Sequence, residues 1–212
     1  MAAAGAPAIN RDRVSQGAPA ATVVGVAGLV ALVAIGLFFT VGQPFGTVND
    51  LALLVLTGSL QPLMLAHYEL GGVVPLWPAR LSLVGATLAV AGWAVIQLAM
   101  VIGVVTFDYE HGATGAFAAE AALQVVIGAW IAGASLLAGR WLPARVRWLG
   151  VVAGLGTIAM SFGLLLGGVS HPLTYLGGVG YQVVLPVWAL LLAGVFRRAA
   201  SGVASPGEPA AA

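Results

Sequence analysis

The chain has 212 residues, of which 60% are hydrophobic and 7% are charged, whereas an ordinary soluble domain has about 25% charged residues. This composition excludes a water-soluble fold and predicts one all-α domain, a polytopic membrane protein whose main partner is the lipid bilayer. The net charge of +1 gives no reason to expect nucleic acid as a partner. Because the chain has no cysteine, disulfides and thiolate metal sites are excluded. We expect no metal and no cofactor.

The N-terminal segment, residues 1–20, is rich in Ala, Pro and Gly and has no apolar periodicity. We predict a disordered cytoplasmic tail there. The apolar run that follows, residues 22–41, is longer than the roughly 7–15 residues of a signal-peptide core. It is therefore predicted to be a retained membrane helix.

Six stretches approach the roughly 20 apolar residues that a spanning helix needs. The second contains Gln61 and Pro62, and we expect it to span if it begins near Gly46. The transmembrane domain would cover residues 21–197 and would be followed by a disordered cytoplasmic tail, residues 198–212. The predicted spans are residues 22–41, 51–66, 81–107, 116–138, 148–168 and 176–196.

The arginines divide the predicted loops into two sets. Cytoplasmic loops are enriched in Lys and Arg, and an odd number of crossings could not separate the arginines in this way. We therefore predict a six-helix bundle with both termini in the cytoplasm. The absence of Lys and the abundance of Ala, Gly and Val favour a bacterial origin, and hence a bacterial cell membrane. All the arginines lie in segments that this topology places on one side of the membrane. Arg11 and Arg13 precede the first span, and Arg80 lies between the second and third. Between the fourth and fifth spans are Arg140, Arg145 and Arg147, and after the sixth are Arg197 and Arg198.

Small residues are expected to hold the bundle together, because the hydrophobic effect does not drive helices together within lipid. The fifth span has two small-x-x-x-small steps, Gly150 with Gly154 and Gly163 with Gly167. It is the predicted interface helix. The glycines form no Gly-x-Gly-x-x-Gly or Walker pattern, which favours this structural role over phosphate binding.

Glu120 opens a polar stripe on the fourth span. At helical spacing it shares one face with Gln124, Gly128, Ile131 and Ser135. A carboxyl group about one turn inside the membrane is desolvated, and it is a candidate proton carrier or acid. The alternative is that Glu120 complements the helix dipole in the first turn.

Asn49 and Asp50 precede the second apolar stretch, where Asx residues cap free backbone N–H groups. One of them is expected to be such a cap. If the helix instead begins near Gly46, Asp50 lies about a turn inside it and forms a carboxylate pair with Glu120. Glu120 and Asp50 are the predicted catalytic pair.

Four glutamines lie inside predicted spans, and they favour hydrogen bonds between helices or contacts with a substrate. Tyr181 and Pro186 follow a Gly177-Gly178-x-Gly180 segment that could be a gate or an irregular helix start. The predicted substrate-binding residues are Gln97, Gln124, Gln182 and Tyr181.

Asp108, Glu110 and His111 form the densest titratable cluster. Together with His171 they could bind a cation, but they match no known ligand spacing, and a solvated loop explains them equally well. His67 is expected at an ordinary helix end, where it would complement the dipole.

Two classes of function are compatible with these residues. The first is a small ligand-binding, transport or accessory bundle, with a small hydrophobic ligand or other membrane subunits as partners; a proton- or cation-coupled carrier would use the same carboxylates. The alternative is an intramembrane enzyme of the cyclase or isomerase type. Such an enzyme would act on a lipidic or isoprenoid substrate through Glu120 and Asp50 near the outer leaflet.

Overall fold

The computed structural model describes residues 11–71, 77–105 and 115–201, except for the side chain of Arg140. This part of the chain is all-helical. It contains α1 (Arg11–Val41), α2 (Phe45–Leu70), α3 (Trp77–Val101), α4 (Gly115–Leu137), η1 (Gly139–Trp141), α5 (Ala144–Gly167), η2 (Gly168–Ser170), α6 (Pro172–Val179), η3 (Gly180–Val184) and α7 (Leu185–Ala200).

Six helical spans in the described residues are long and apolar enough to cross a membrane. The sixth is a composite, because α6, the π-helix η3 and α7 follow one another without a break from Pro172 to Ala200. The all-helical fold and the number of spans therefore agree with the prediction from apolar run lengths.

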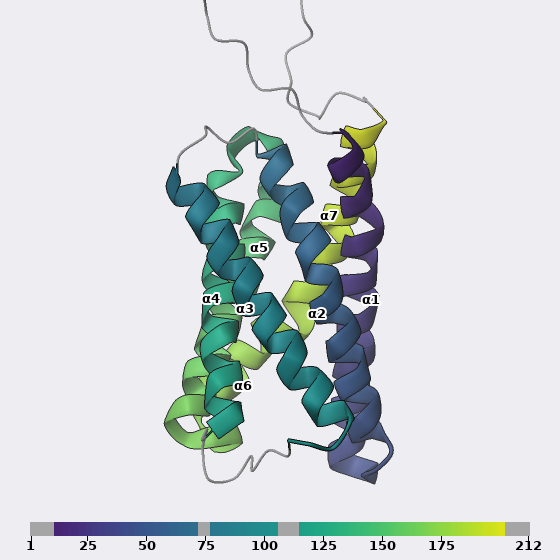
Figure 1. The fold of residues 1–212 in the computed structure, drawn as a ribbon, viewed down its shortest axis with the longest axis vertical. Helices are drawn as coiled ribbons and strands as arrows, with labels where there is room; N and C mark the ends of the chain where they lie inside the picture. Colours follow the sequence, from purple (N-terminus) through teal and green to yellow (C-terminus); the bar gives the residue numbers. More distant parts are fainter. Residues whose placement is uncertain (1–10, 72–76, 106–114, 202–212) are drawn as a thin grey trace, which may run out of the picture.

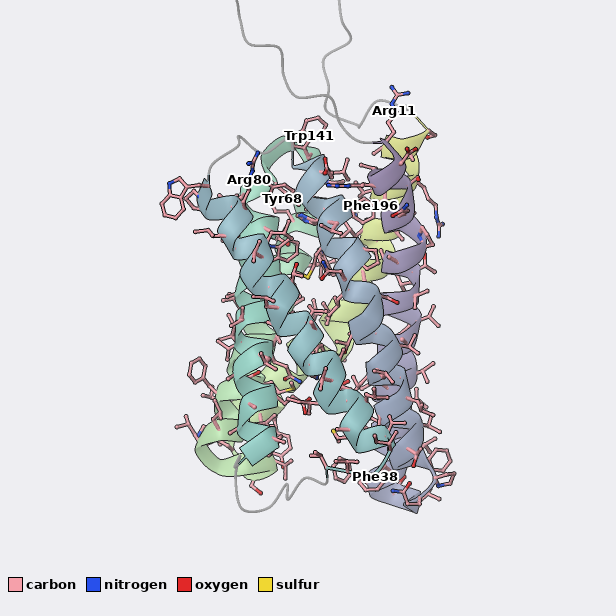
Figure 2. All side chains as sticks on the ribbon, in the orientation of Figure 1. Arg11, Phe38, Tyr68, Arg80, Trp141 and Phe196 are labelled. Carbon is pink, nitrogen blue, oxygen red and sulfur yellow. The ribbon has the colours of Figure 1, made fainter. Side chains whose placement is uncertain are left out.

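The spans run alternately up and down, as Figure 1 shows. α1 packs along α2 and α7, α5 packs along α4 and α6, and α3 crosses one face and contacts α2 and α4. The arginines gather at one end of the bundle, where α1 begins and α7 ends; Figure 2 labels Arg11 and Arg80 there. We call this the arginine end. Phe38 is labelled at the opposite end.

The first helix begins earlier than the sequence predicted. Residues 11–20 were expected in a disordered tail, but they form the first turns of α1. Among them, Gly17 lets α1 approach its neighbours closely, because a methyl group there would overlap Ala66 of α2 and Phe196 of α7. Arg13 also forms an ion pair with Glu69, with 2.7 Å between Nη1 and Oε1. Likewise, residues 198–200, predicted in the C-terminal tail, belong to α7.

The second helix also begins before the apolar stretch, at Phe45. Asp50 therefore lies in its second turn, and neither Asn49 nor Asp50 is an N-cap. The cap position is Pro44, without a side-chain cap hydrogen bond. The capping interpretation is wrong, and the alternative start near Gly46 is correct, because polar residues at the end of a span can extend its helix beyond its apolar run.

Glycines on α5 permit the closest helix contacts, as the small-residue pattern predicted. A methyl group at Gly154 would overlap the backbone of α4 at Gly128 and Ala132. On another face of α5, Gly156 meets Gly180. Without these side-chain-free positions α5 could not pack closely against both α4 and the composite sixth span.

Candidate functional site

Glu120 is the centre of a buried hydrogen-bond network between α3 and α4. Its Oε1 accepts hydrogen bonds from Trp93 Nε1, Gln97 Nε2 and Gln124 Nε2, each 2.9 Å long. All four side chains are buried. Trp93 and Gln97 share a face of α3 because they are four residues apart, as do Glu120 and Gln124 on α4. The donors are arranged as a carboxylate acceptor requires.

The network extends to two further spans. Ser161 Oγ on α5 lies 3.3 Å from Gln124 Oε1. The Tyr181 ring, in the π-helix η3, packs at 6.3 Å from the ring of Trp93. We call these side chains the Glu120 cluster: Trp93, Gln97, Glu120, Gln124, Ser161 and Tyr181.

Several atoms at this end of the bundle are buried without a hydrogen-bond partner among the described residues. Gln97 Oε1 and Asn49 Oδ1 can only accept hydrogen bonds, as can Glu120 Oε2 when the carboxyl group is ionised, and the Tyr181 hydroxyl can accept or donate. Leaving a buried polar group unpaired costs on the order of 1–3 kcal/mol. A carboxylate used only to join helices would be expected to use both oxygens, so the unpartnered Oε2 points to a further task.

Asp50 joins this end of the bundle from α2. It is partly buried, and Asn49 Nδ2 donates to its Oδ1 at 3.4 Å. No hydrogen bond connects Asp50 and Glu120 within the described part of the chain. Asp50 is therefore a second acid near the same end of the bundle, where α2 and α4 begin, rather than a member of the hydrogen-bond network.

The structure separates the predicted binding residues. It brings Gln97, Gln124 and Tyr181 to Glu120, whereas the half-buried side chain of Gln182 makes no hydrogen bond to any described residue. Gln61 joins two helices, because its Nε2 donates to Thr87 Oγ1 at 3.2 Å.

The outer loop residues do not extend this site. Asp108, Glu110 and His111 lie outside the described residues. His171 instead caps α6, because its Nδ1 accepts from the backbone N–H of Leu173 at 3.3 Å.

Sequence reasoning missed Trp93 and Ser161. The only signal for Trp93 is its position one turn before Gln97, which places both on the face of α3 that packs inward. Ser161 is four residues after Thr157, and both hydroxyls lie on the buried face of α5. Hydroxyls on an interface helix were the available hint, because they commonly bond across helices.

The grooves on the outer surface are of a different kind. Two grooves of about 430 and 480 Å³ run between α1 and α2 and are lined by side chains such as Val26, Val30 and Val48. Almost every lining residue is apolar, so in a membrane they suit contact with lipid chains. They contain none of the Glu120 cluster.

The Glu120 cluster can accept a proton or hold a group that carries hydrogen-bond donors. Among the described residues no three His, Asp or Glu side chains gather as metal ligands would. No protein-family model, curated protein or solved structure matches the chain. The residues of the cluster are therefore the basis for a proposed function.

Proposed function

We propose that this multi-pass membrane protein is a ligand-binding or transport bundle that takes up a small cationic ligand, of the ammonium type, at the Glu120 cluster. One observation supports the proposal above the others. Glu120 has one oxygen held by three N–H donors, while its second oxygen is buried with no partner in the described residues.

The unpartnered atoms favour a donor-rich ligand. Glu120 Oε2 and Gln97 Oε1 are both acceptors, and they belong to side chains that are hydrogen-bonded to each other. An ammonium group has three N–H donors and a positive charge, which complements a desolvated carboxylate. The rings of Trp93 and Tyr181, already packed together, add the aromatic faces that attract organic cations. A small amine with an apolar body combines these features.

α3 is the span that would move to admit such a ligand. Only five of its residues are buried, and two of those, Trp93 and Gln97, belong to the Glu120 cluster. The other three are Ala86, Ala89 and Val90, which offer little side chain for packing. The hydrogen bonds of Trp93 and Gln97 to Glu120 are therefore part of what holds α3, beside its packing against α2, so a ligand that replaced them would loosen the helix.

Amine binding should depend on the charge of Glu120. We expect cyclohexylammonium or benzylammonium to raise the melting temperature of the purified protein in detergent, and cyclohexanol or benzyl alcohol not to. Glu120→Gln should weaken amine binding by about a hundredfold or more, because a buried cation would lose its counter-charge. The measurement is thermal unfolding against ligand concentration.

Glu69→Gln is the matched control, because Glu69 is an acidic residue at the arginine end, far along α2 from the site. It should leave amine stabilisation unchanged. If every amine affected the wild type and Glu120→Gln alike, cation recognition at Glu120 would be refuted.

We also propose that the arginine end faces the cytoplasm, because cytoplasmic loops are enriched in Arg. The chain has no native cysteine, so single cysteines report the side. In intact cells of a bacterial host, a membrane-impermeant maleimide should label Gln43→Cys, at the opposite end. It should label Ser201→Cys only after the cells are opened. The reverse pattern would overturn the orientation.

An intramembrane enzyme is the second candidate function. The presence of Asp50 and Glu120 near the same end of the bundle favours it, because two carboxylates in different surroundings can serve as acid and base. A lipidic or isoprenoid substrate would reach them from the membrane. Both Asp50→Asn and Glu120→Gln would then abolish conversion of an isoprenoid in a host lipid extract, measured by mass spectrometry. Amine binding that survives Asp50→Asn would favour the first function.

A further inference from the structure

A second set of buried polar side chains lies nearer the arginine end. His67 of α2, Ser135 of α4 and Trp188 of α7 are each at most 4% exposed. His67 Nε2, Ser135 Oγ and Trp188 Nε1 have no hydrogen-bond partner within the described residues. We call these three side chains the His67 cluster. His67 lies in the last turn of α2, as expected, and its ring is enclosed in the core.

Contacts bring the three side chains together. The ring of His67 lies 6.2 Å from that of Trp188 and 5.7 Å from that of Trp130. Ser135 Oγ and Trp188 Nε1 both approach α5 at Gly150, where an added methyl group would overlap them. Helices from three parts of the chain therefore direct unpartnered polar atoms to one region of the core, and a glycine leaves room for them.

The chemistry of this region is opposite to that of the Glu120 cluster. Trp188 Nε1–H can only donate, and Ser135 Oγ and His67 Nε2 can each donate as well. The unpartnered atoms at Glu120, by contrast, are mostly acceptors. A group that accepts several hydrogen bonds at once fits the His67 cluster.

The surrounding charge favours a negative ligand. Seven arginines whose side chains are described lie at this end, against Asp12 and Glu69 among the described residues, and Glu69 is already paired with Arg13. His67 is three residues from the end of α2 at Leu70, which is about 5 Å of helix rise. Fixed positive charge at one end of a low-dielectric bundle raises the local concentration of anions there.

We propose that the His67 cluster binds a small monovalent anion of halide size, which reaches it from the arginine end. Ser135 and Trp188 donate to the anion, and His67 closes the site from α2. This proposal does not depend on cation binding at Glu120.

Iodide provides a direct test, because it quenches tryptophan fluorescence on contact and Trp188 belongs to the site. At constant ionic strength, maintained with sulfate, we expect a saturable component of quenching in the purified wild type. Chloride, which does not quench, should compete with it. Trp188→Phe should abolish the saturable component. Trp148→Phe should keep it, because Trp148 is a half-exposed ring at the same end.

Ser135→Ala keeps the fluorophore and removes one donor. It should raise the iodide concentration at half-saturation about tenfold, which corresponds to the loss of one hydrogen bond to a charged group. Glu120→Gln should leave the iodide titration unchanged, which separates this site from the cation site. Purely linear quenching in the wild type, a saturable component that survives Trp188→Phe, or an unchanged half-saturation in Ser135→Ala would each overturn the proposal.

Discussion

Glu120→Ala is expected to lower the free energy of unfolding by about 2–9 kcal/mol. The substitution removes the common acceptor of Trp93, Gln97 and Gln124, and each buried donor left unpaired costs about 1–3 kcal/mol. Hydrogen bonds in membrane proteins average only about 0.6 kcal/mol, so the lower half of this range applies if the donors find new partners. The measurement is reversible unfolding in mixed detergent micelles.

Two further variants give reference values for the loss of unfolding free energy in Glu120→Ala. Glu120→Gln retains a carbonyl oxygen for the donors, so we expect it to destabilise far less than Glu120→Ala although it lacks the charge. Gln61→Ala breaks the single hydrogen bond to Thr87 and should cost about 0.6 kcal/mol. A Glu120→Ala protein no less stable than Gln61→Ala would show that the network contributes little to the fold.

Gly154→Ala is expected to destabilise the protein by about 1–3 kcal/mol, the range for overpacking a close-packed core. The new methyl group would overlap the backbone of α4 at Gly128 and Ala132. Backbone cannot rotate aside as a flexible side chain can, so α4 and α5 must separate. The contact between Gln124 and Ser161 spans the same interface, so amine binding should weaken as well.

Gly133→Ala is the matched control on α4, because an added methyl group there meets nothing within 4 Å. A glycine inside a helix is less favourable than alanine by about 1 kcal/mol, so this variant should be unchanged or slightly more stable. Equal destabilisation by Gly154→Ala and Gly133→Ala would mean that glycine itself, rather than the α4–α5 contact, is responsible. Unfolding in detergent distinguishes the two.

Much of the fold could be read from the sequence because it depends on local properties. Apolar run length gave the number of spans, and helical spacing alone placed Glu120, Gln124 and Ser135 on one buried face of α4. The start of α1 was missed, since residues such as Gly17 are not apolar enough to signal a span. Their contribution depends on contact with Ala66 and Phe196, which the sequence does not reveal.

The candidate site was only half predictable for a similar reason. Glu120 stands out because a carboxyl group inside a membrane span is rare, but its partner Trp93 is determined by how α3 is aligned along α4. Whether Asp50 is a helix cap or lies inside the helix depended on where α2 begins. His67 next to Trp188 results from packing between helices far apart in the sequence. Spacing within one helix is visible in a sequence, whereas alignment between helices is not.

The π-helix η3 contains one more residue than a regular α-helical turn would, and this single residue affects which neighbours the surrounding side chains face. A π turn holds about one residue more than an α turn, and each residue of an α-helix turns by about 100°. Because of this extra residue, Gly177 and Gly180 face α5 while Tyr181 still faces Trp93. Deleting a single residue between Gly178 and Leu185 would let the segment relax into a regular α-helix. Tyr181 could not then face Trp93 while Gly177 and Gly180 still face α5. A relative of this protein that lacked this residue would therefore need a different side chain beside Glu120.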